Sequence, residues 1–302
     1  MKKLPYIQTS VFVDNRFSFT GNQLATFIDK EKNAKLTTEE MQGIALELNY
    51  SETTFILDTQ KEGCSVKVRI FTPGSELKFA GHPTIGTAFV LKESELIESE
   101  IKETTMELGI GPIRVTYNDD STISMFQNQP EFLDKFEDKE TIAKILGIKP
   151  EDILDDFPMQ FVSTGFPFLI VPIKDLETIK SINIDAQLQI SALQEFITSK
   201  IIAFSSETDF KDSSVHVRMF APEVGVIEDP ATGSAAGPLG AYLEQWNVLE
   251  NHEKTSEMRF EQGFEIKRPS QLIVRNQYEN KIIKKVVVSG KTRKTAMGEF
   301  FL

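Results

Sequence analysis

The sequence predicts an α+β protein made of two similar domains, and three observations support this. The chain has 302 residues, which is long for a single hydrophobic core. A segment from Val68 to Val90 recurs in altered form from Val217 to Leu243, with Arg69 and Arg218 in equivalent places 149 residues apart. That offset is close to half of the chain, as expected for an internal duplication. Alternating strand-like segments and apolar helical segments occur in both halves.

Each copy of the repeated segment reads as a strand, a turn and a helix. In the first copy, Val66, Val68 and Ile70 alternate with polar residues, which is typical of a half-buried strand. An apolar helix begins near Gly81 and Pro83, where proline is well tolerated, and the free N–H groups of such a helix start prefer an anion. Two domains facing each other would therefore hold a carboxylate substrate in a shared cleft. Chance likeness of two strand–turn–helix units is the alternative.

Composition and charge narrow the class of partner. A net charge of −12 argues against nucleic acid, which would require a basic face. No run approaches the roughly 18 apolar residues of a membrane span. The N-terminal residues lead into an ordinary strand pattern without the apolar core of a signal peptide. We therefore expect a cytoplasmic protein that binds a small anionic molecule, rather than nucleic acid or a membrane.

The residue types that bind metals and cofactors are sparse. Cys64 is the only cysteine, so the chain has no disulfide framework and no cysteine metal cluster. Its histidines, His82, His216 and His252, do not share the spacing of a metal site. We expect His216 to be structural or at the surface, and His252 to lie in a polar loop. Because GxGxxG, P-loop and GxSxG motifs are also missing, the sequence predicts no metal and no cofactor.

The first domain is expected to span residues 1–128. A helix over 37–49 has clear signals, because Thr37 and Glu40 can form a capping box and apolar residues follow at helical spacing. Gln129-Pro130 marks the expected domain boundary. Strands are predicted at residues 7–13, 24–28, 55–57, 66–71, 102–108, 113–117 and 122–127.

The second domain is expected to span residues 129–302, and its last strand can return to the first domain. Gly263 and Gly290 are predicted to lie in turns. The predicted helices cover residues 140–146, a segment starting at Pro150, 176–182, 190–198 and 233–246. The predicted strands cover residues 166–173, 201–204, 258–262, 271–275, 283–288 and 296–302.

Three titratable residues are candidates for catalysis. Glu52 lies between a helix end and a strand, a place where functional groups are common, although a solvated loop acid is the alternative. His82 begins a helix whose dipole disfavours the imidazolium, so we expect a neutral ring. Asp229 precedes the second helix, where it can either cap the helix or orient a substrate hydroxyl or amine. A glutamate with an ordinary pKa of about 4.3 needs desolvation, such as domain closure, to act as a base on carbon.

Two segments resemble a known family. IFTPxxELxFAGHPTxGTA, from Ile70, and FAPxxGxxEDPATGSAAGPL, from Phe220, are similar to the signature segments of the PhzF-like phenazine biosynthesis family, whose fold is that of diaminopimelate epimerase. The resemblance implies two duplicated domains, each a mostly antiparallel strand barrel around a central apolar helix, with the active site in the cleft between them. It also implies a homodimer and a cofactor-independent isomerase that shifts a proton on a cyclic hydroxy or amino acid, as the phenazine enzyme does on dihydro-3-hydroxyanthranilate.

The resemblance also assigns roles to residues of this chain. ELNYSETTF is similar to the family segment whose glutamate is the acid/base, which implies that role for Glu52, and the candidates His82 and Asp229 complete the expected catalytic set. Gln23 and Lys78 depart from the family pattern, which usually has proline at both positions, so substrate identity stays open. The residues expected to bind substrate are Asn22, Ser51, Gly81, Thr232, Gly233 and Ser234.

The single cysteine distinguishes between two groups of proteins that share this fold, those that use two catalytic cysteines and those that do not. Diaminopimelate epimerases and proline racemases use two cysteines, one at each helix start, and here both positions lack cysteine. A two-thiol racemase is therefore excluded, and one carboxylate that removes and returns a proton fits an isomerase. The alternative is a non-catalytic protein that keeps the duplicated fold and binds a small ligand.

Overall fold

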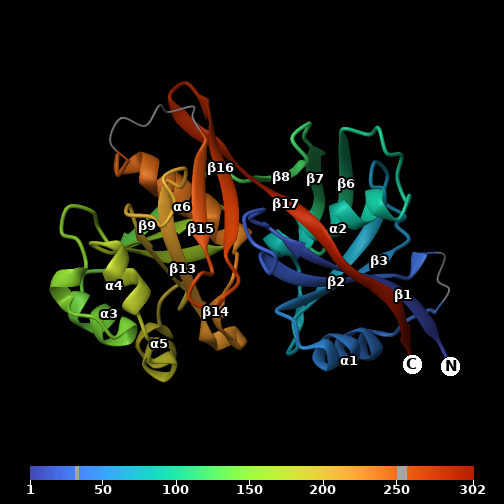
Figure 1. The fold of residues 1–302 in the computed structure, drawn as a ribbon, viewed down its shortest axis with the longest axis horizontal. Helices are drawn as coiled ribbons and strands as arrows, with labels where there is room; N and C mark the ends of the chain where they lie inside the picture. The colour runs from blue at the N-terminus through green and yellow to red at the C-terminus, as the bar shows by residue number, and fades with distance from the viewer. Residues whose placement is uncertain (31–33, 250–256) are drawn as a thin grey trace. The chain divides into compact units, whose positions relative to one another are not determined.

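The computed structural model describes residues 1–30, 34–249 and 257–302 (Figure 1). His252, predicted to lie in a polar loop, is outside these described residues. Internal contacts divide the chain into two compact units. Unit 1 comprises Met1–Phe126 and Ser289–Leu302, and unit 2 comprises Gln127–Val288.

Unit 1 is a strand barrel around one helix. β2 and β3 pair in parallel, as do β4 and β6, whereas β1 with β17, β1 with β2, β3 with β4, β4 with β5, β6 with β7 and β7 with β8 pair antiparallel. β17 pairs with both β1 and β8, which closes the ring of strands. The strands are β1 Lys3–Val11, β2 Asn22–Ile28, β3 Glu52–Leu57, β4 Val66–Phe71, β5 Glu76–Leu77, β6 Glu103–Leu108, β7 Gly111–Tyr117, β8 Thr122–Gln127 and the part of β17 (Ile282–Phe301) from Ser289 onward.

The helix inside unit 1 is α2, Gly81–Glu93, which Figure 1 shows in cyan among the strands. Nearly every side chain of α2 is buried, as expected for a helix that is apolar on all sides. Gly86 allows the close packing, since a Cβ there would lie 2.5 Å from Leu24 Cδ2. α1, Thr38–Leu48, has the predicted capping box between Thr37 and Glu40.

Unit 2 repeats this plan. α6, Gly233–Gln245, is its buried apolar helix, and shorter helices lie between the strands. The other helical segments are α3 Lys139–Leu146, η2 Pro150–Asp152, α4 Leu176–Ser181, α5 Ala186–Leu193 and η3 Pro222–Val224. The strands are β9 Glu131–Lys135, β10 Gln160–Ser163, β11 Pro167–Pro172, β12 Ile201–Ser205, β13 Val215–Ala221, β14 Val226–Asp229, β15 Met258–Gln262 and β16 Ser270–Glu279.

The predicted duplication is visible in strand pairing and in side-chain contacts. β4 is antiparallel to β3 and β5 and parallel to β6, and β13 is antiparallel to β12 and β14 and parallel to β15. α2 and α6 each have 13 residues. Arg69 pairs with Glu76 through two nitrogens, and Arg218 pairs with Glu228 in the same way. The fold is therefore α+β and internally duplicated, as the repeat predicted.

Three predicted elements differ from the structure. Gly290 does not form a turn, because β17 runs unbroken through it and the ring of Phe12 packs where a Cβ would lie, 2.3 Å from Phe12 Cδ1. The helix expected from Pro150 is only the short 3₁₀ turn η2. The helix expected at 190–198 begins earlier, at Ala186, because Asp185 caps it by accepting a hydrogen bond from the Leu188 N–H.

Candidate active site

The turn after α1 places Glu52 at the start of β3. Asn49 ends the helix in the left-handed region, with φ 53°, and its N–H donates to the Ala45 carbonyl. β3 then begins at Glu52, which lies opposite Leu24 in the parallel pairing with β2. Asn22 is the first residue of β2, so Ser51, Glu52 and Asn22 lie at the same end of these two strands.

His82 joins this group from the first turn of α2. Its Nε2 lies 3.5 Å from Glu52 Oε2, and its Nδ1 lies 3.2 Å from Asn22 Nδ2. Ser51 Oγ donates to Asn22 Oδ1 over 3.0 Å. The helix begins at Gly81 after the N-cap Ala80, whose side chain makes no capping bond, so the N–H groups of the first turn have no side-chain cap. Unit 1 thus brings together Asn22, Ser51, Gly81, Glu52 and His82, all predicted site residues.

The His82 ring is neutral. Its side chain is 5% exposed, and burial lowers the pKa of His82 to about 3, against a smaller opposing effect of the Gln23 carbonyl. The sequence predicted a neutral ring from the helix dipole, but the main cause here is desolvation. Glu52 and His82 therefore do not form an ion pair near neutral pH. They place a carboxylate next to a neutral imidazole, a pairing suited to moving a proton.

Unit 2 contains a second group of predicted residues at the start of α6. Asp229 is buried, and its Oδ2 accepts a hydrogen bond of 2.5 Å from Thr232 Oγ1. Thr232 is the N-cap residue of α6, but its side chain makes no capping bond to the helix. Gly233 and Ser234 follow as the first helical residues. The N-terminus of α6 thus resembles that of α2 in that the N-cap residue makes no side-chain capping bond.

Gln262 supports this second group, although little in its sequence context predicts that role. Its Nε2 donates to the Asp229 carbonyl over 2.8 Å and to Thr232 Oγ1 over 3.1 Å, while its Oε1 accepts from the Thr232 N–H over 3.2 Å. Gly263, which follows with φ 80°, brings the turn against the Pro230 backbone, where a Cβ would lie 2.6 Å from the Pro230 carbonyl oxygen. A polar residue before a turn glycine was the available signal.

Gln127 also supports the start of α6, and no sequence pattern predicts this role. Its Nε2 donates to the Gly233 carbonyl over 2.7 Å, and its Oε1 accepts a hydrogen bond from Thr164 Oγ1. Gly237 makes room for it, because a Cβ there would lie 1.8 Å from Gln127 Oε1. Two buried amides from distant strands therefore hold the first turn of α6.

His216 is buried in an ion-pair cluster of unit 2, consistent with a structural role. Its Nδ1 lies 2.8 Å from Glu261 Oε1, and its Nε2 lies 3.0 Å from Glu265 Oε1. Burial lowers the pKa of His216, but the hydrogen bonds to Glu261 and Glu265 outweigh burial and raise it to about 9. Asp209, His216 and Glu261 bring possible ligand atoms within 4.8 Å of one another. An imidazolium that donates from both nitrogens has no lone pair for a metal.

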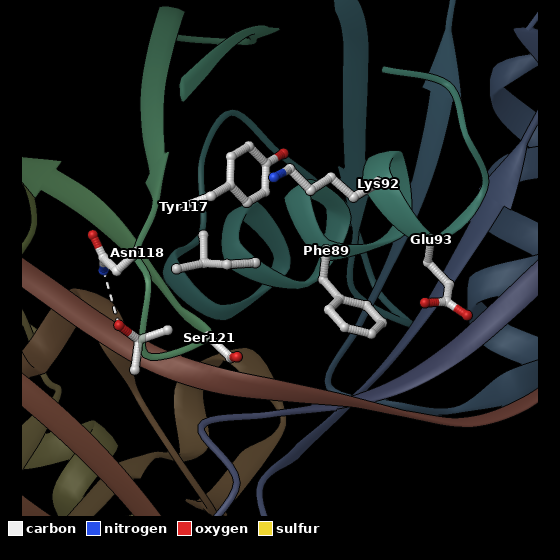
Figure 2. A pocket seen from close by; sticks show the side chains of 8 residues that line it. Phe89, Lys92, Glu93, Tyr117, Asn118 and Ser121 are labelled. Carbon is white, nitrogen blue, oxygen red and sulfur yellow. Dashed lines mark hydrogen bonds between the residues drawn. The ribbon is translucent and has the colours of Figure 1, made fainter. Parts of the chain in front are cut away.

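A pocket of about 320 Å³ lies at the other end of α2, and none of the candidate site residues lines it (Figure 2). Figure 2 shows Lys92 beside the Tyr117 ring, with the Lys92 ammonium 4.1 Å from the ring centre. The same ammonium donates to the Ser99 carbonyl. The pocket lining comes from α2 and from the β7–β8 hairpin: Phe89, Lys92, Glu93, Tyr117, Asn118, Ser121, Thr122 and Ile123.

Comparisons with known proteins identify the family of this chain. The family model of phenazine biosynthesis-like proteins, PhzC-PhzF, matches residues 9–298. The chain belongs to this family. It is 36% identical to the uncharacterized isomerase YfhB of Bacillus subtilis, over 76% of this chain and 78% of that protein. It is 32% identical to the trans-2,3-dihydro-3-hydroxyanthranilate isomerase of Pseudomonas aeruginosa, over 93% of this chain and 94% of that protein.

Solved structures confirm the fold. The PhzF family phenazine biosynthesis protein of Bacillus anthracis has a TM-score of 0.88 and 29% identity, with all of both chains covered. A probable proline racemase from Agrobacterium radiobacter has a TM-score of 0.64 at 11% identity, over 99% of this chain and 93% of that one, which shows the shared fold alone. The predicted diaminopimelate epimerase-like fold is confirmed, and the protein is an isomerase of the PhzF type. In the described part of the chain, no helix is both long and apolar enough to cross a membrane.

Proposed function

We propose that this isomerase shifts a proton on a small carboxylate-bearing substrate without a cofactor, with Glu52 as the general acid/base. The observation that carries the proposal is the Glu52 carboxylate 3.5 Å from a buried, neutral His82 at the start of α2. One residue that removes a proton from carbon and returns it to another carbon leaves the substrate isomeric and needs no redox partner. A well-placed acid/base contributes about 10²–10⁴-fold to such a rate.

The N-terminus of α2 supports a carboxylate-bearing substrate. Backbone N–H groups and the helix dipole at such a terminus bind anions. The Nε2 of His82 is buried and has no hydrogen-bond partner among the described residues. Leaving a buried polar atom without a hydrogen bond costs free energy, so a ligand that forms a hydrogen bond with it binds more tightly. A cyclic hydroxy or amino acid has the carboxylate and polar groups that this site would recognise, and trans-2,3-dihydro-3-hydroxyanthranilate, named for a relative 32% identical to this chain, is the first candidate.

The remaining site residues keep their predicted roles as part of the proposal. Asn22, Ser51 and Gly81 in unit 1 would shape the Glu52 side of the site. Asp229, with Thr232, Gly233 and Ser234 in unit 2, would orient a substrate hydroxyl or amine. A homodimer and a cytoplasmic location also remain predictions.

The proposal is tested by proton exchange. The purified protein is incubated with trans-2,3-dihydro-3-hydroxyanthranilate in heavy water and the substrate is followed by NMR, for wild type and for Glu52→Gln. We expect isomerisation with deuterium uptake, slowed about 10²–10⁴-fold in Glu52→Gln. Glu47→Gln, the same substitution at an exposed position of α1, is the matched control and should react at the wild-type rate.

Two results would contradict the proposal. If Glu52→Gln reacts as fast as wild type, Glu52 is not the base. If wild type binds the compound without exchanging any C–H proton, this substrate is wrong, and a binding protein with the duplicated fold becomes the better description.

A further inference from the structure

The pocket at the C-terminal end of α2 contains an ammonium group without a counter-charge. Lys92 is half-buried, and its Nζ donates to the Ser99 carbonyl over 2.7 Å and lies 4.1 Å from the centre of the Tyr117 ring (Figure 2). Both of these partners are neutral, and in the described part of the chain no carboxylate forms an ion pair with Lys92. Because an ammonium has three donors, at least one N–H is left for a ligand.

The acidic side chains nearest to the pocket have other partners. Glu93, which also lines the pocket, forms an ion pair with Lys294. At the tip of the β7–β8 hairpin, Asp120 accepts hydrogen bonds from the N–H and from the hydroxyl of Thr122. These contacts leave the charge of Lys92 to be balanced by something that enters the pocket, and an anion would do so.

The rest of the pocket suits a ring with a polar group on the side away from Lys92. The apolar part of the lining comes from the rings of Phe89 and Tyr117 and from the side chain of Ile123. Figure 2 shows Ser121 on the opposite side of the pocket from Lys92. The volume of about 320 Å³ falls within the range of about 300–1,000 Å³ that is usual for small-molecule sites. A planar ring with polar groups at both ends therefore matches the lining.

The hairpin wall of the pocket is held in place before any ligand arrives. Asn118 Nδ2 donates to Thr122 Oγ1 over 2.8 Å and to Ser124 Oγ over 2.7 Å. The Ser121 N–H donates to the Asn118 carbonyl over 3.1 Å. Walls that are already ordered lose little conformational freedom on binding, so a small ligand can bind without a large entropic cost.

We propose that this pocket is a second binding site, and that its ligand is a small aromatic carboxylate. The carboxylate would accept a hydrogen bond from the Lys92 ammonium, and the ring would pack against Phe89 and Ile123. A hydroxyl or amino substituent on the far side of the ring would contact Ser121. None of the candidate active-site residues lines the pocket, so this inference goes beyond the proposed function and does not depend on it.

The proposal is tested by NMR titration of the ¹⁵N-labelled protein with 4-hydroxybenzoate, which has the carboxylate, the ring and the hydroxyl. We expect saturable shifts of the backbone amides of residues 121–123, with a Kd of about 1 mM or lower. Two further compounds separate the contributions, since 4-hydroxybenzamide keeps the ring without the charge and acetate keeps the charge without the ring. Each should bind at this hairpin at least about tenfold more weakly than 4-hydroxybenzoate.

Lys92→Met tests the recognition of the anion, because it keeps the apolar stem of the side chain and removes the charge. We expect the Kd for 4-hydroxybenzoate to rise about tenfold or more, since hydrogen bonds to charged groups are the strong ones. Lys67→Met, the same substitution at an exposed position of β4 in the same unit, is the matched control and should bind as wild type does. If Lys92→Met does not fold, Phe89→Ala, at a half-buried residue, removes one wall and should weaken binding as well.

Three results would overturn the proposal. The first is an absence of shifts at residues 121–123 up to about 10 mM 4-hydroxybenzoate. The second is an unchanged Kd in Lys92→Met, or in Phe89→Ala where that variant takes its place. The third is a set of shifts confined to the amides around Glu52 and His82, which would show that the compound binds only at the candidate active site. The titration involves no turnover, so a failure of the isomerase assay would leave this proposal standing.

Discussion

Each of the two units buries a histidine, but near neutral pH the ring of His82 is uncharged and the ring of His216 is positively charged. His82 in unit 1 faces the neutral Asn22 amide, and the Glu52 carboxylate is 3.5 Å away, so burial keeps its pKa at about 3. His216 in unit 2 makes contacts of 2.8 and 3.0 Å with two carboxylates, which hold its pKa at about 9. Burial alone therefore neutralises a histidine, and two hydrogen-bonded acids restore its charge.

This difference separates a reactive pair from a structural one. Both ring nitrogens of His216 have a carboxylate as hydrogen-bond partner, and Glu261 also accepts a hydrogen bond from the Asp209 N–H. In the His82 group, one buried ring nitrogen has no hydrogen-bond partner in the described part of the chain. Perturbed histidines without satisfied partners are candidates for function, whereas satisfied ones are usually part of the core.

The largest expected effect comes from comparing the two duplicated arginines. Arg218 and its partner Glu228 have side chains 7% exposed, whereas Arg69 and Glu76 are 20% and 40% exposed. Arg218→Met leaves a buried carboxylate without its cation, so we expect a loss of about 3–5 kcal/mol in the free energy of unfolding. Arg69→Met should lose only about 1 kcal/mol, because its pair is partly solvated. Urea unfolding of both variants measures the loss in the free energy of unfolding. Equal losses would show that the difference in burial between the two arginine–glutamate pairs does not affect their contribution to stability.

The pH dependence of stability should reveal both histidines. The pKa of His216 is raised to about 9, so its contribution is complete below the unfolded value of 6.5 and is lost as pH rises through 9. The pKa of His82 is lowered to about 3, so its contribution is present above 6.5 and is lost as pH falls from 6.5 toward 3. At about 1.36 kcal/mol per pKa unit, the loss amounts to roughly 3 kcal/mol for His216 by pH 9, and to roughly 3 kcal/mol for His82 by pH 4.

Unfolding free energies are measured from pH 4 to 10 for wild type, His216→Gln and His82→Gln. We expect His216→Gln to flatten the decline between pH 6.5 and 9, and His82→Gln to flatten the decline below 6.5. Each variant serves as the control for the other, because the two expected windows do not overlap. A His216→Gln curve parallel to that of wild type across the alkaline window would rule out a charged His216.

The sequence predicted the local features of the fold well. The capping box of α1, the end of α3 at Leu146 and the boundaries of β15 follow from neighbouring residues, and the structure confirms them. The repeat also predicted the duplicated strand–turn–helix units, because two copies of one pattern carry more information than either alone. Glu52 and His82 were found by resemblance as well as by position, and the structure brings them together.

Features that depend on distant partners could not be predicted. A glycine such as Gly290 is typical of a turn. Here, however, the ring of Phe12, which is far away in sequence, occupies the space that a side chain at position 290 would fill. The charge on His216 depends on Glu261 and Glu265, which lie 45 and 49 residues along the chain. Gln262 and Gln127 also act through long-range hydrogen bonds. Side-chain amides have no periodic pattern that reveals such partners, so these residues emerge only from the three-dimensional arrangement.

The smallest expected effect in this comparison concerns Gln262, which supports the start of α6. Gln262→Leu keeps the volume of the side chain but removes its hydrogen bonds to the Thr232 backbone and side chain and to the Asp229 carbonyl. Because those backbone groups are left buried and unsatisfied, we expect a loss of about 1–3 kcal/mol in the free energy of unfolding. Thermal or urea unfolding measures the loss, and Gln271→Leu, on the less buried neighbouring strand β16, is the matched control.

The activity of Gln262→Leu then bears on Asp229. If Asp229 orients the substrate, loosening the turn that holds it should raise KM or lower kcat by about tenfold or more, since small misplacements of catalytic groups are costly. If the variant loses stability but isomerises at the wild-type rate under conditions where it is fully folded, Asp229 and the start of α6 have only a structural role. Unit 1 would then hold all of the catalytic chemistry, and the duplicated helix start in unit 2 would have kept the architecture without the reaction.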